Sequence, residues 1–370
     1  MKKAITILLG ITMTAALLVG CGSTAETTPA AETAVEETTE APAEEAVAEE
    51  ATEEVAEETT EAGGVKTGLA VVSSVAKSTN PAEEDGLGQV DSTVVAVLVG
   101  EDGKIIDCKI DAIQTKINFS AEGKITSDLA AEIKTKQELG ADYGLGKASG
   151  IKKEWNEQAN ALADYVVGKT VEEVKGIAVA EGVPTDADLT SSVTIKIGDY
   201  ITAIEKAVAG AKALGAGNED KLGLAIETSA SKSTDATAEE EGLIQAYTFY
   251  SAVTTDADGK VTSCLIDASQ GSVNFDATGS ITTDLAVAPL TKQELKDEYG
   301  MKSASAIGAE WYTQADSFAT YVTGKTAAEV TGIAVSEEGL AADADLISSV
   351  TVHIGSFISI VEKAIANTAN

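Results

Sequence analysis

The spacing of apolar positions along the chain is typical of strands in some segments and of helices in others. Residues 93–99 are rich in β-branched side chains, and residues 105–113 alternate apolar with polar positions, which is typical of strands. The intervening Glu101-Asp-Gly-Lys104 favours a hairpin turn. Residues 247–254 and 261–266 repeat the pattern. The sequence therefore predicts two β-hairpins.

Helical patterns follow the first hairpin. Thr135-Lys-Gln-Glu138 and Thr170-Val-Glu-Glu173 are capping boxes, which predict two helix starts. The first of these helices is expected to end at Gly140 or Gly144, and the second at Gly176. A longer amphipathic helix is expected between them, ending at Gly168. Its apolar face comprises Ile151, Trp155, Gln158, Leu162 and Val166.

A last amphipathic helix closes each half of the chain. Asp199 is expected to cap the first of them. The stripe residues are Ile201, Ile204, Val208 and Ala211 in one half, and Ile358, Val361 and Ile365 in the other. Strands paired in a hairpin and followed by separate helices indicate an α+β fold.

The two halves are copies of one unit. Lys136-Gln-Glu-Leu139 recurs as Lys292-Gln-Glu-Leu295, and Trp155 recurs as Trp311 at the same offset. A period this long indicates a duplicated domain and not a solenoid. Each half is expected to fold on its own, because each holds a hairpin, helices and a terminal stripe.

These patterns divide the chain into a leader, a tether and two domains. The predicted segments are a signal peptide (1–20), a tether (21–65), a first domain (66–213), a Gly-rich linker (214–220) and a second domain (221–370).

The first segment has the order of an export signal. Lys2 and Lys3 precede an apolar run, which ends in Leu18-Val19-Gly20-Cys21. This run is short for a transmembrane helix. The tetrapeptide resembles the bacterial lipobox, which implies that Cys21 becomes lipidated. The Ala/Thr/Glu-rich tether has no basic residue before Lys66, so we expect it to be disordered. The chain is therefore expected to be lipid-anchored at the extracytoplasmic face of the cell membrane.

Composition excludes several classes of function. The formal net charge is −34, so nucleic acid and anionic lipid surfaces repel the chain. Cys108 and Cys264 are equivalent strand positions, for which burial is the better interpretation than a disulfide. His353 is the only histidine, so a zinc site or a hydrolytic triad has little basis. We expect no catalytic residues and no metal site.

One acidic motif with a hydroxyl cluster occurs in both halves. It reads Asp188-Leu-Thr-Ser-Ser-Val-Thr194 in the first and Asp345-Leu-Ile-Ser-Ser-Val-Thr351 in the second, each just before the last helix. The motif resembles that of flavinylated FMN-binding domains, as found in sodium-pumping NADH:quinone reductases and Gram-positive electron-transfer lipoproteins. Their motif is Asp-x-x-Ser-Gly-Ala-Thr, and this chain has Ser-Val in place of Gly-Ala.

The resemblance implies a function and its residues. FMN would be bound covalently through a phosphoester to Thr194 and Thr351, with noncovalent binding left as an alternative. Four neighbouring residues would complete the FMN-binding motif. They are Asp188 and Ser191 in the first half, and Asp345 and Ser348 in the second.

The implied partners are a flavin transferase, a membrane electron donor and an extracellular electron acceptor. The chain would carry electrons and would not itself be an enzyme.

Plainer interpretations of the same residues stay open. The acidic and hydroxyl residues are also typical of solvated turns, and Trp155, Trp311, Tyr143 and Tyr299 fit core packing better than stacking on a flavin. The alternative function is a non-redox surface lipoprotein that binds a small ligand or acts in adhesion. A third is a signal peptide that releases short signalling peptides.

Overall fold

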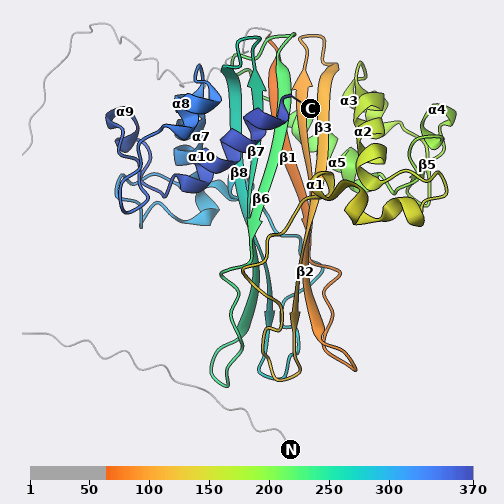
Figure 1. Cartoon of the computed structure of the whole chain (residues 1–370), viewed down its shortest axis with the longest axis vertical. Coiled ribbons are helices and arrows are strands. Elements are labelled where there is room, and N and C mark those ends of the chain that lie inside the picture. The colour runs from red at the N-terminus through yellow and green to blue at the C-terminus, as the bar shows by residue number, and fades with distance from the viewer. Residues whose placement is uncertain (1–63, 370) are drawn as a thin grey trace, which may run out of the picture. The chain divides into compact units, whose positions relative to one another are not determined.

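The structure is a computed structural model that describes residues 64–369 (Figure 1). The predicted signal peptide, the predicted lipidation site Cys21 and nearly all of the predicted tether lie outside the described residues.

Each copy is built on a three-stranded antiparallel sheet, with the second strand in the centre. The strands of the first copy are β1 (Lys66–Ser74), β2 (Gly86–Val99) and β3 (Ile105–Phe119). Those of the second copy are β6 (Lys221–Ser229), β7 (Gly242–Thr255) and β8 (Val261–Phe275). A third, small sheet pairs β4 (Val179–Ala180) with β5 (Val183–Pro184). The predicted hairpins are confirmed, but their strands are longer than expected, and β1 and β6 were not predicted.

Short and long helices follow each sheet. The first copy has α1 (Lys136–Leu139), the 3-10 helices η1 (Gly140–Tyr143) and η2 (Leu145–Lys147), α2 (Trp155–Val166), α3 (Val171–Lys175), α4 (Ala187–Thr190) and α5 (Gly198–Ala209). The second has α6 (Lys292–Leu295), η3 (Lys296–Tyr299), α7 (Trp311–Val322), α8 (Ala327–Thr331), α9 (Ala344–Ile347) and α10 (Gly355–Asn367). The predicted α+β class is therefore confirmed.

The helix boundaries follow local chemistry. Both predicted capping boxes form. The side chains of Thr135 and Thr170 each accept the backbone N–H of the glutamate three residues later, and the carboxylate of that glutamate accepts the backbone N–H of the threonine. The prediction for Asp199 was wrong, since α5 begins at Gly198 and its N-cap, Ile197, makes no side-chain hydrogen bond. The fully buried Ile197 fixes the chain there through packing instead.

Strand β2 is buried on both faces. Val95, Val97 and Val99 belong to a core shared with the helices of the same copy. The alternate residues Val94, Ala96 and Leu98 belong to a core shared with the sheet of the other copy. Since successive side chains point to opposite faces, the near-continuous apolar run reflects burial on both sides. The order of layers is helices, sheet, sheet, helices (Figure 1).

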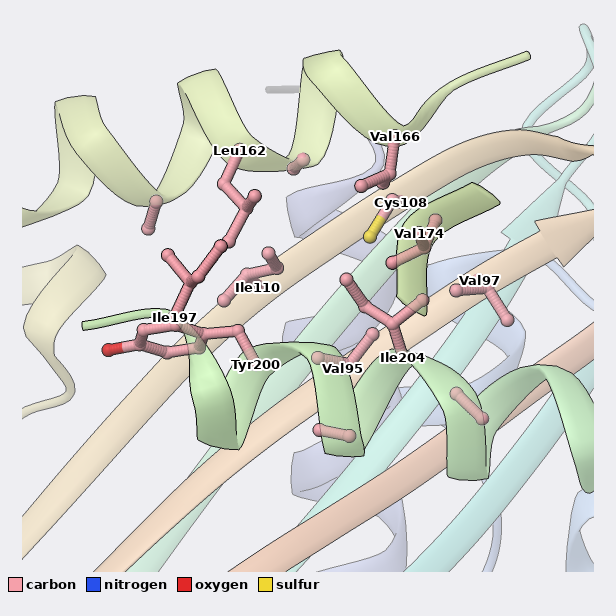
Figure 2. Packing of buried hydrophobic residues seen from close by; sticks show 14 of the residues in the cluster. Val95, Val97, Cys108, Ile110, Leu162, Val166, Val174, Ile197, Tyr200 and Ile204 are labelled. Atoms are coloured by element: carbon pink, nitrogen blue, oxygen red, sulfur yellow. The ribbon is translucent and has the colours of Figure 1, made fainter. Parts of the chain in front are cut away.

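The outer core of the first copy joins its sheet to α2, α3 and α5. Leu162 and Val166 from α2 meet Ile204 from α5 above the sheet, and Cys108 lies among them (Figure 2). Cys108 and its equivalent Cys264 are buried and free, which confirms that they act as small apolar residues. Burial raises the pKa of both thiols.

The inner core draws its residues from both copies. Phe119 of β3 stacks on Phe275 of β8 with ring centroids 4.4 Å apart. The Tyr250 hydroxyl, also fully buried, donates to Ser92 of the other copy at 3.2 Å. Independent folding of each half stays a prediction. A half on its own would have to fold with the inner face of its sheet exposed to solvent, because that face is covered by the other copy.

Each last helix passes very close to the first strand of its own sheet. A Cβ placed on Gly68 of β1 would lie 2.0 Å from the carbonyl oxygen of Ala207 in α5. A Cβ placed on Gly223 of β6 would lie at the same distance from the carbonyl oxygen of Ala364 in α10. Only glycine permits this approach, which fixes the position of the helix that follows each threonine motif.

Candidate functional site

The site begins with the one-turn helix that carries the acidic part of each motif. Asp186, the N-cap of α4, accepts the backbone N–H of Asp188 at 2.9 Å and the hydroxyl of Tyr165 at 3.0 Å. Leu189 anchors the turn, since it is 1% exposed. Asp343 caps α9 in the same way. The turn therefore has a defined position, although most of its side chains face solvent.

The threonines lie between this turn and the last helix. The Thr194 backbone N–H donates to Gln158 Oε1 at 2.8 Å, and the Thr194 hydroxyl donates to the same oxygen at 3.2 Å. Thr351 makes the equivalent bonds to Gln314 at 2.8 Å and 3.3 Å. Each threonine is half-buried and bonded to its glutamine through the same two groups. The one difference is that Gln314 Oε1 also accepts the backbone N–H of Val352 at 3.2 Å.

The glutamine amides are fixed at their other end too. Gln158 Nε2 donates to Ser149 Oγ at 3.2 Å and to the Lys153 carbonyl at 3.0 Å. Gln314 Nε2 donates to Ser305 Oγ and to the Ala309 carbonyl, each at 3.1 Å. These partners also determine which amide atom is the oxygen, since a backbone carbonyl only accepts and a backbone N–H only donates.

The other motif residues differ in exposure. Asp188, Ser191, Asp345 and Ser348 are exposed, and Ser192 is half-buried. The valine before each threonine is buried in the outer core, with Val193 at 0% and Val350 at 1% exposed. The Ser-Val variant of the motif thus places an apolar side chain in the core and leaves the flanking hydroxyls toward solvent.

The tryptophans belong to the core. Trp155 and Trp311 are 2% and 3% exposed, so their rings have no free face on which a ligand could stack. Trp155 Nε1 donates to the Tyr200 hydroxyl at 3.0 Å, which satisfies its one polar group. The prediction of core packing is confirmed for both tryptophans.

A lysine lies against aromatic rings in each copy, and it is more deeply buried in the second copy than in the first. Lys292 Nζ lies 4.6, 4.4 and 4.8 Å from the ring centroids of Tyr247, Tyr299 and Trp311, and donates to the Tyr247 hydroxyl at 2.8 Å. Burial lowers the pKa of Lys292 to about 8. Lys136, its equivalent, is only half-buried.

Buried carboxyl groups join the strands to α1 and α6. Asp111 Oδ1 accepts the backbone N–H of Gln137 at 3.1 Å, and Asp267 does the same for Gln293. Burial raises the pKa of Asp111 to about 6 and that of Asp267 to about 7, against the lowering effect of these hydrogen bonds. Sequence reasoning missed both aspartates, because each occurs in an alternating strand pattern where an aspartate is expected to be solvated.

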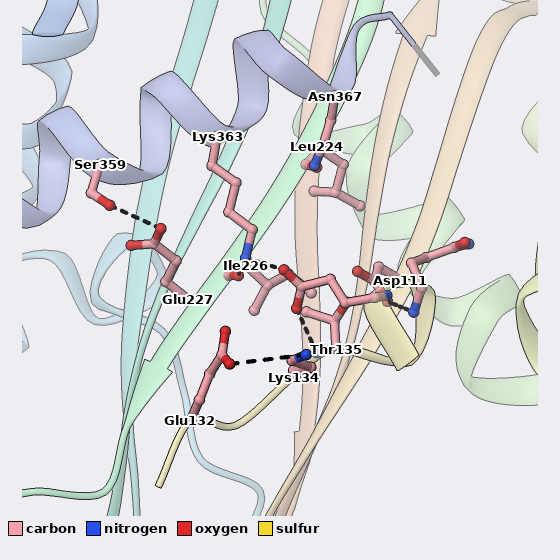
Figure 3. A network of polar contacts seen from close by, with 12 residues as sticks. Asp111, Glu132, Lys134, Thr135, Leu224, Ile226, Glu227, Ser359, Lys363 and Asn367 are labelled. Carbon is pink, nitrogen blue, oxygen red and sulfur yellow. Dashed lines mark hydrogen bonds and ion pairs between the residues drawn. The ribbon is translucent and has the colours of Figure 1, made fainter. Parts of the chain in front are cut away.

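A polar network lies between the copies (Figure 3). Several of its residues, among them Thr135 and Lys363, line a cavity of about 610 Å³. Lys363 of α10 reaches across to Glu138 of α1 at 2.6 Å and donates to the Ile226 carbonyl at 2.7 Å. In the equivalent ion pair, Lys206 of the first copy contacts Glu294 of the second copy at 2.5 Å. Asp111 and Glu138 both line the cavity.

Within residues 64–369, no group of histidine, cysteine or acidic side chains could hold a metal ion. In the same part of the chain, no helix is both long and apolar enough to cross a membrane. Comparison with protein-family models, with curated proteins and with solved structures gave no match.

Proposed function

We propose that the chain carries electrons through FMN bound covalently to Thr194 and Thr351. The observation that supports this proposal best is the matched environment of the two threonine hydroxyls. Each hydroxyl is half-buried and hydrogen-bonded to a fully buried glutamine, and each follows an exposed acidic turn. The same arrangement is present in both copies.

The threonine environment suits a phosphoester. When Thr194 Oγ1 loses its hydrogen, Gln158 Oε1 still accepts the Thr194 backbone N–H at 2.8 Å. The buried amide therefore stays satisfied in both the free and the esterified state. The exposed side of the motif leaves room for the attached group and for the transferase that delivers it.

The attachment uses FAD as the donor and a separate magnesium-dependent transferase as the catalyst. Thr194 Oγ1 forms a bond to the phosphorus on the flavin side of the FAD pyrophosphate, and the bond from that phosphorus to the bridging oxygen breaks. AMP leaves with the bridging oxygen, and the hydroxyl proton passes to the transferase or to solvent. No oxidant or reductant takes part in this step.

Bound FMN would supply the redox chemistry, and the protein would supply attachment and environment. With Cys21 lipidated, the chain would lie at the extracytoplasmic face of the membrane, accept electrons from a membrane donor and pass them to an extracellular acceptor. A covalent bond suits such a location, because free FMN would diffuse away.

The test is coexpression with an active flavin transferase, followed by intact-mass measurement. We expect two FMN-sized additions in the unchanged protein, one in Thr194→Ala or Thr351→Ala, and none in the double variant. Ser192→Ala and Ser349→Ala are matched controls, since each removes a neighbouring hydroxyl outside the FMN-binding motif and should leave both additions. A colourless protein that stays unmodified and binds no added FMN would contradict the proposal.

A second candidate is binding of a small polar ligand without redox chemistry. The cavity of about 610 Å³ between the copies favours it, because this volume is typical of ligand sites. The two candidates are separated by the same experiment, since a ligand-binding lipoprotein would acquire no mass at either threonine.

A further inference from the structure

Gln158 and Gln314 are polar residues on the apolar face of an amphipathic helix. Both are 0% exposed, and each lies one turn after the tryptophan that begins its helix. Burying a primary amide costs free energy unless both of its ends are hydrogen-bonded. Here both ends are bonded in both copies, so the amide has a single orientation.

That orientation determines where the threonine oxygen points. Gln158 Oε1 accepts the Thr194 hydroxyl at 3.2 Å and the backbone N–H of the same residue at 2.8 Å. The threonine side chain is β-branched and has few rotamers, so these two bonds to one atom fix it. The hydroxyl hydrogen faces the helix, and the remaining lone pairs of Oγ1 face away from it.

We propose that Gln158 and Gln314 are positioning residues for the modification of Thr194 and Thr351. Each holds the acceptor oxygen with its lone pairs toward the incoming phosphorus. This inference rests on the proposed function and adds to it the residue that prepares the site. The glutamines do not act as bases, because an amide oxygen takes no proton at ordinary pH. The proton of the threonine hydroxyl passes to the transferase or to solvent.

A neutral acceptor is required at this position. After esterification the oxygen that was bonded to Gln158 carries a phosphodiester with one negative charge. A glutamate there would place a second negative charge beside it in a buried setting, where repulsion is poorly screened. Glutamine accepts a hydrogen bond from the threonine hydroxyl before the reaction. Because it is uncharged, it does not repel the negative phosphodiester after the reaction.

The duplicated chain provides its own reference site. In Gln158→Met, the change affects only the first threonine, and the methionine keeps nearly the same length and volume. After coexpression or incubation with transferase and FAD, peptide mass spectrometry gives the ratio of modified Thr194 to modified Thr351. We expect this ratio to fall by about 10- to 100-fold, the usual cost of misplacing a reacting atom. Gln314→Met should change the ratio in the opposite direction.

A second variant separates positioning from a merely structural role. Gln158→Glu keeps an oxygen where the threonine needs one, but burial raises the pKa of the new carboxyl group. We expect the ratio to be low at pH 8 and to recover toward the unchanged protein's value as the carboxyl becomes neutral near pH 5. The pH dependence of the transferase itself cancels, because both threonines are in the same molecule. Ionising this buried carboxyl group also strains the fold, so urea unfolding of the variant is measured at both pH values. A positioning role changes the ratio while the unfolding transition stays cooperative at both pH values, whereas a structural role changes the two together.

The outcomes distinguish this inference from the proposed function. If both threonines are modified in the unchanged protein and Gln158→Met leaves their ratio as it was, the positioning role is wrong and the proposed function stands. If neither threonine of the unchanged protein is modified by an active transferase, both are wrong. Full modification of Thr351 in the variant shows that the second copy has folded, and urea unfolding reports on the first.

Discussion

At the scale of single residues, Asp111 offers a test of the electrostatics. Burial raises its pKa to about 6, above the ordinary value of 3.8. The folded state thus binds the proton more tightly than the unfolded state, and Asp111 makes folding less favourable as the pH rises from about 4 to about 6. Asp111→Asn stays neutral and keeps an oxygen for the Gln137 N–H. We expect the variant to gain up to about 3 kcal/mol relative to the unchanged protein between pH 4 and pH 7.

Urea unfolding at a series of pH values measures this difference. Asp102→Asn is the matched control, since Asp102 lies exposed in the turn between β2 and β3 and is solvated in both states. A free-energy difference for Asp111→Asn that does not change with pH would show that the carboxyl group is not desolvated in the folded protein.

The sequence allowed part of the site to be predicted at this scale. Thr194 and Asp188 were chosen as candidates because both halves keep the motif that contains them, and their role stays a prediction. Gln158 was assigned to a helical stripe without a function, because its partner is distant in sequence. The one available signal was a polar residue at an apolar position in both copies, Gln158 and Gln314. The buried Asp111 gave no such signal, since the residues that contact it, Thr135 and Gln137, are distant in sequence.

At the scale of elements, the capping boxes are the best-predicted feature, and they are open to measurement. Thr170→Ala removes the side chain that accepts the Glu173 N–H at 3.3 Å. We expect a loss of about 1 kcal/mol in the free energy of unfolding. Thr326→Ala should cost about the same in the second copy, and the two losses should add, because the sites share no contacts.

Thr313→Ala is the control for the capping prediction. Thr313 is exposed on α7, where alanine has the better helix propensity, so its replacement should be neutral or slightly stabilising. Equal losses at Thr313 and Thr170 would mean that the cap contributes nothing beyond the general effect of the substitution.

Local chemistry explains why helices were predicted better than strands. A capping box is complete within four residues, so the sequence contains the whole signal for α1 and α3. The edge strand β1 pairs with β2 across a long loop, and its register depends on residues distant in sequence. Strand β2 has no clean alternation, because both of its faces are covered, and its length could not be judged from periodicity.

At the scale of the whole molecule, the contact between the sheets carries much of the stability. Phe119 and Phe275 are both fully buried and stack across the two copies. We expect Phe119→Ala to cost about 3–5 kcal/mol. The double variant with Phe275→Ala should cost less than the sum of the two single changes, by about 0.5–1.5 kcal/mol for the ring pair.

A distant aromatic supplies the control for this cycle. Phe318 is fully buried in the outer core of the second copy. Phe318→Ala should therefore be costly alone but additive with Phe119→Ala. Coupling between Phe119 and Phe275 no larger than that between Phe119 and Phe318 would mean that the stacked pair adds nothing specific.

The repeat allowed the duplication to be predicted, but not the way in which the copies meet. Residues of the inner core, such as Ala96 and Tyr250, look like ordinary strand residues in the sequence, and nothing local says that they face a second sheet. The exchanged ion pairs of Glu138 and Glu294 also depend on this packing, which exists only once both copies are present.

The shared inner core has a consequence for the order of events during synthesis. The first copy is complete while the strands that cover its inner face are still being made. Val94, Ala96 and Leu98 therefore have no permanent cover until β6, β7 and β8 follow. An uncovered apolar sheet face is prone to association with other chains. Until β6, β7 and β8 have been made, the nascent first copy is therefore more prone to such association than the complete protein.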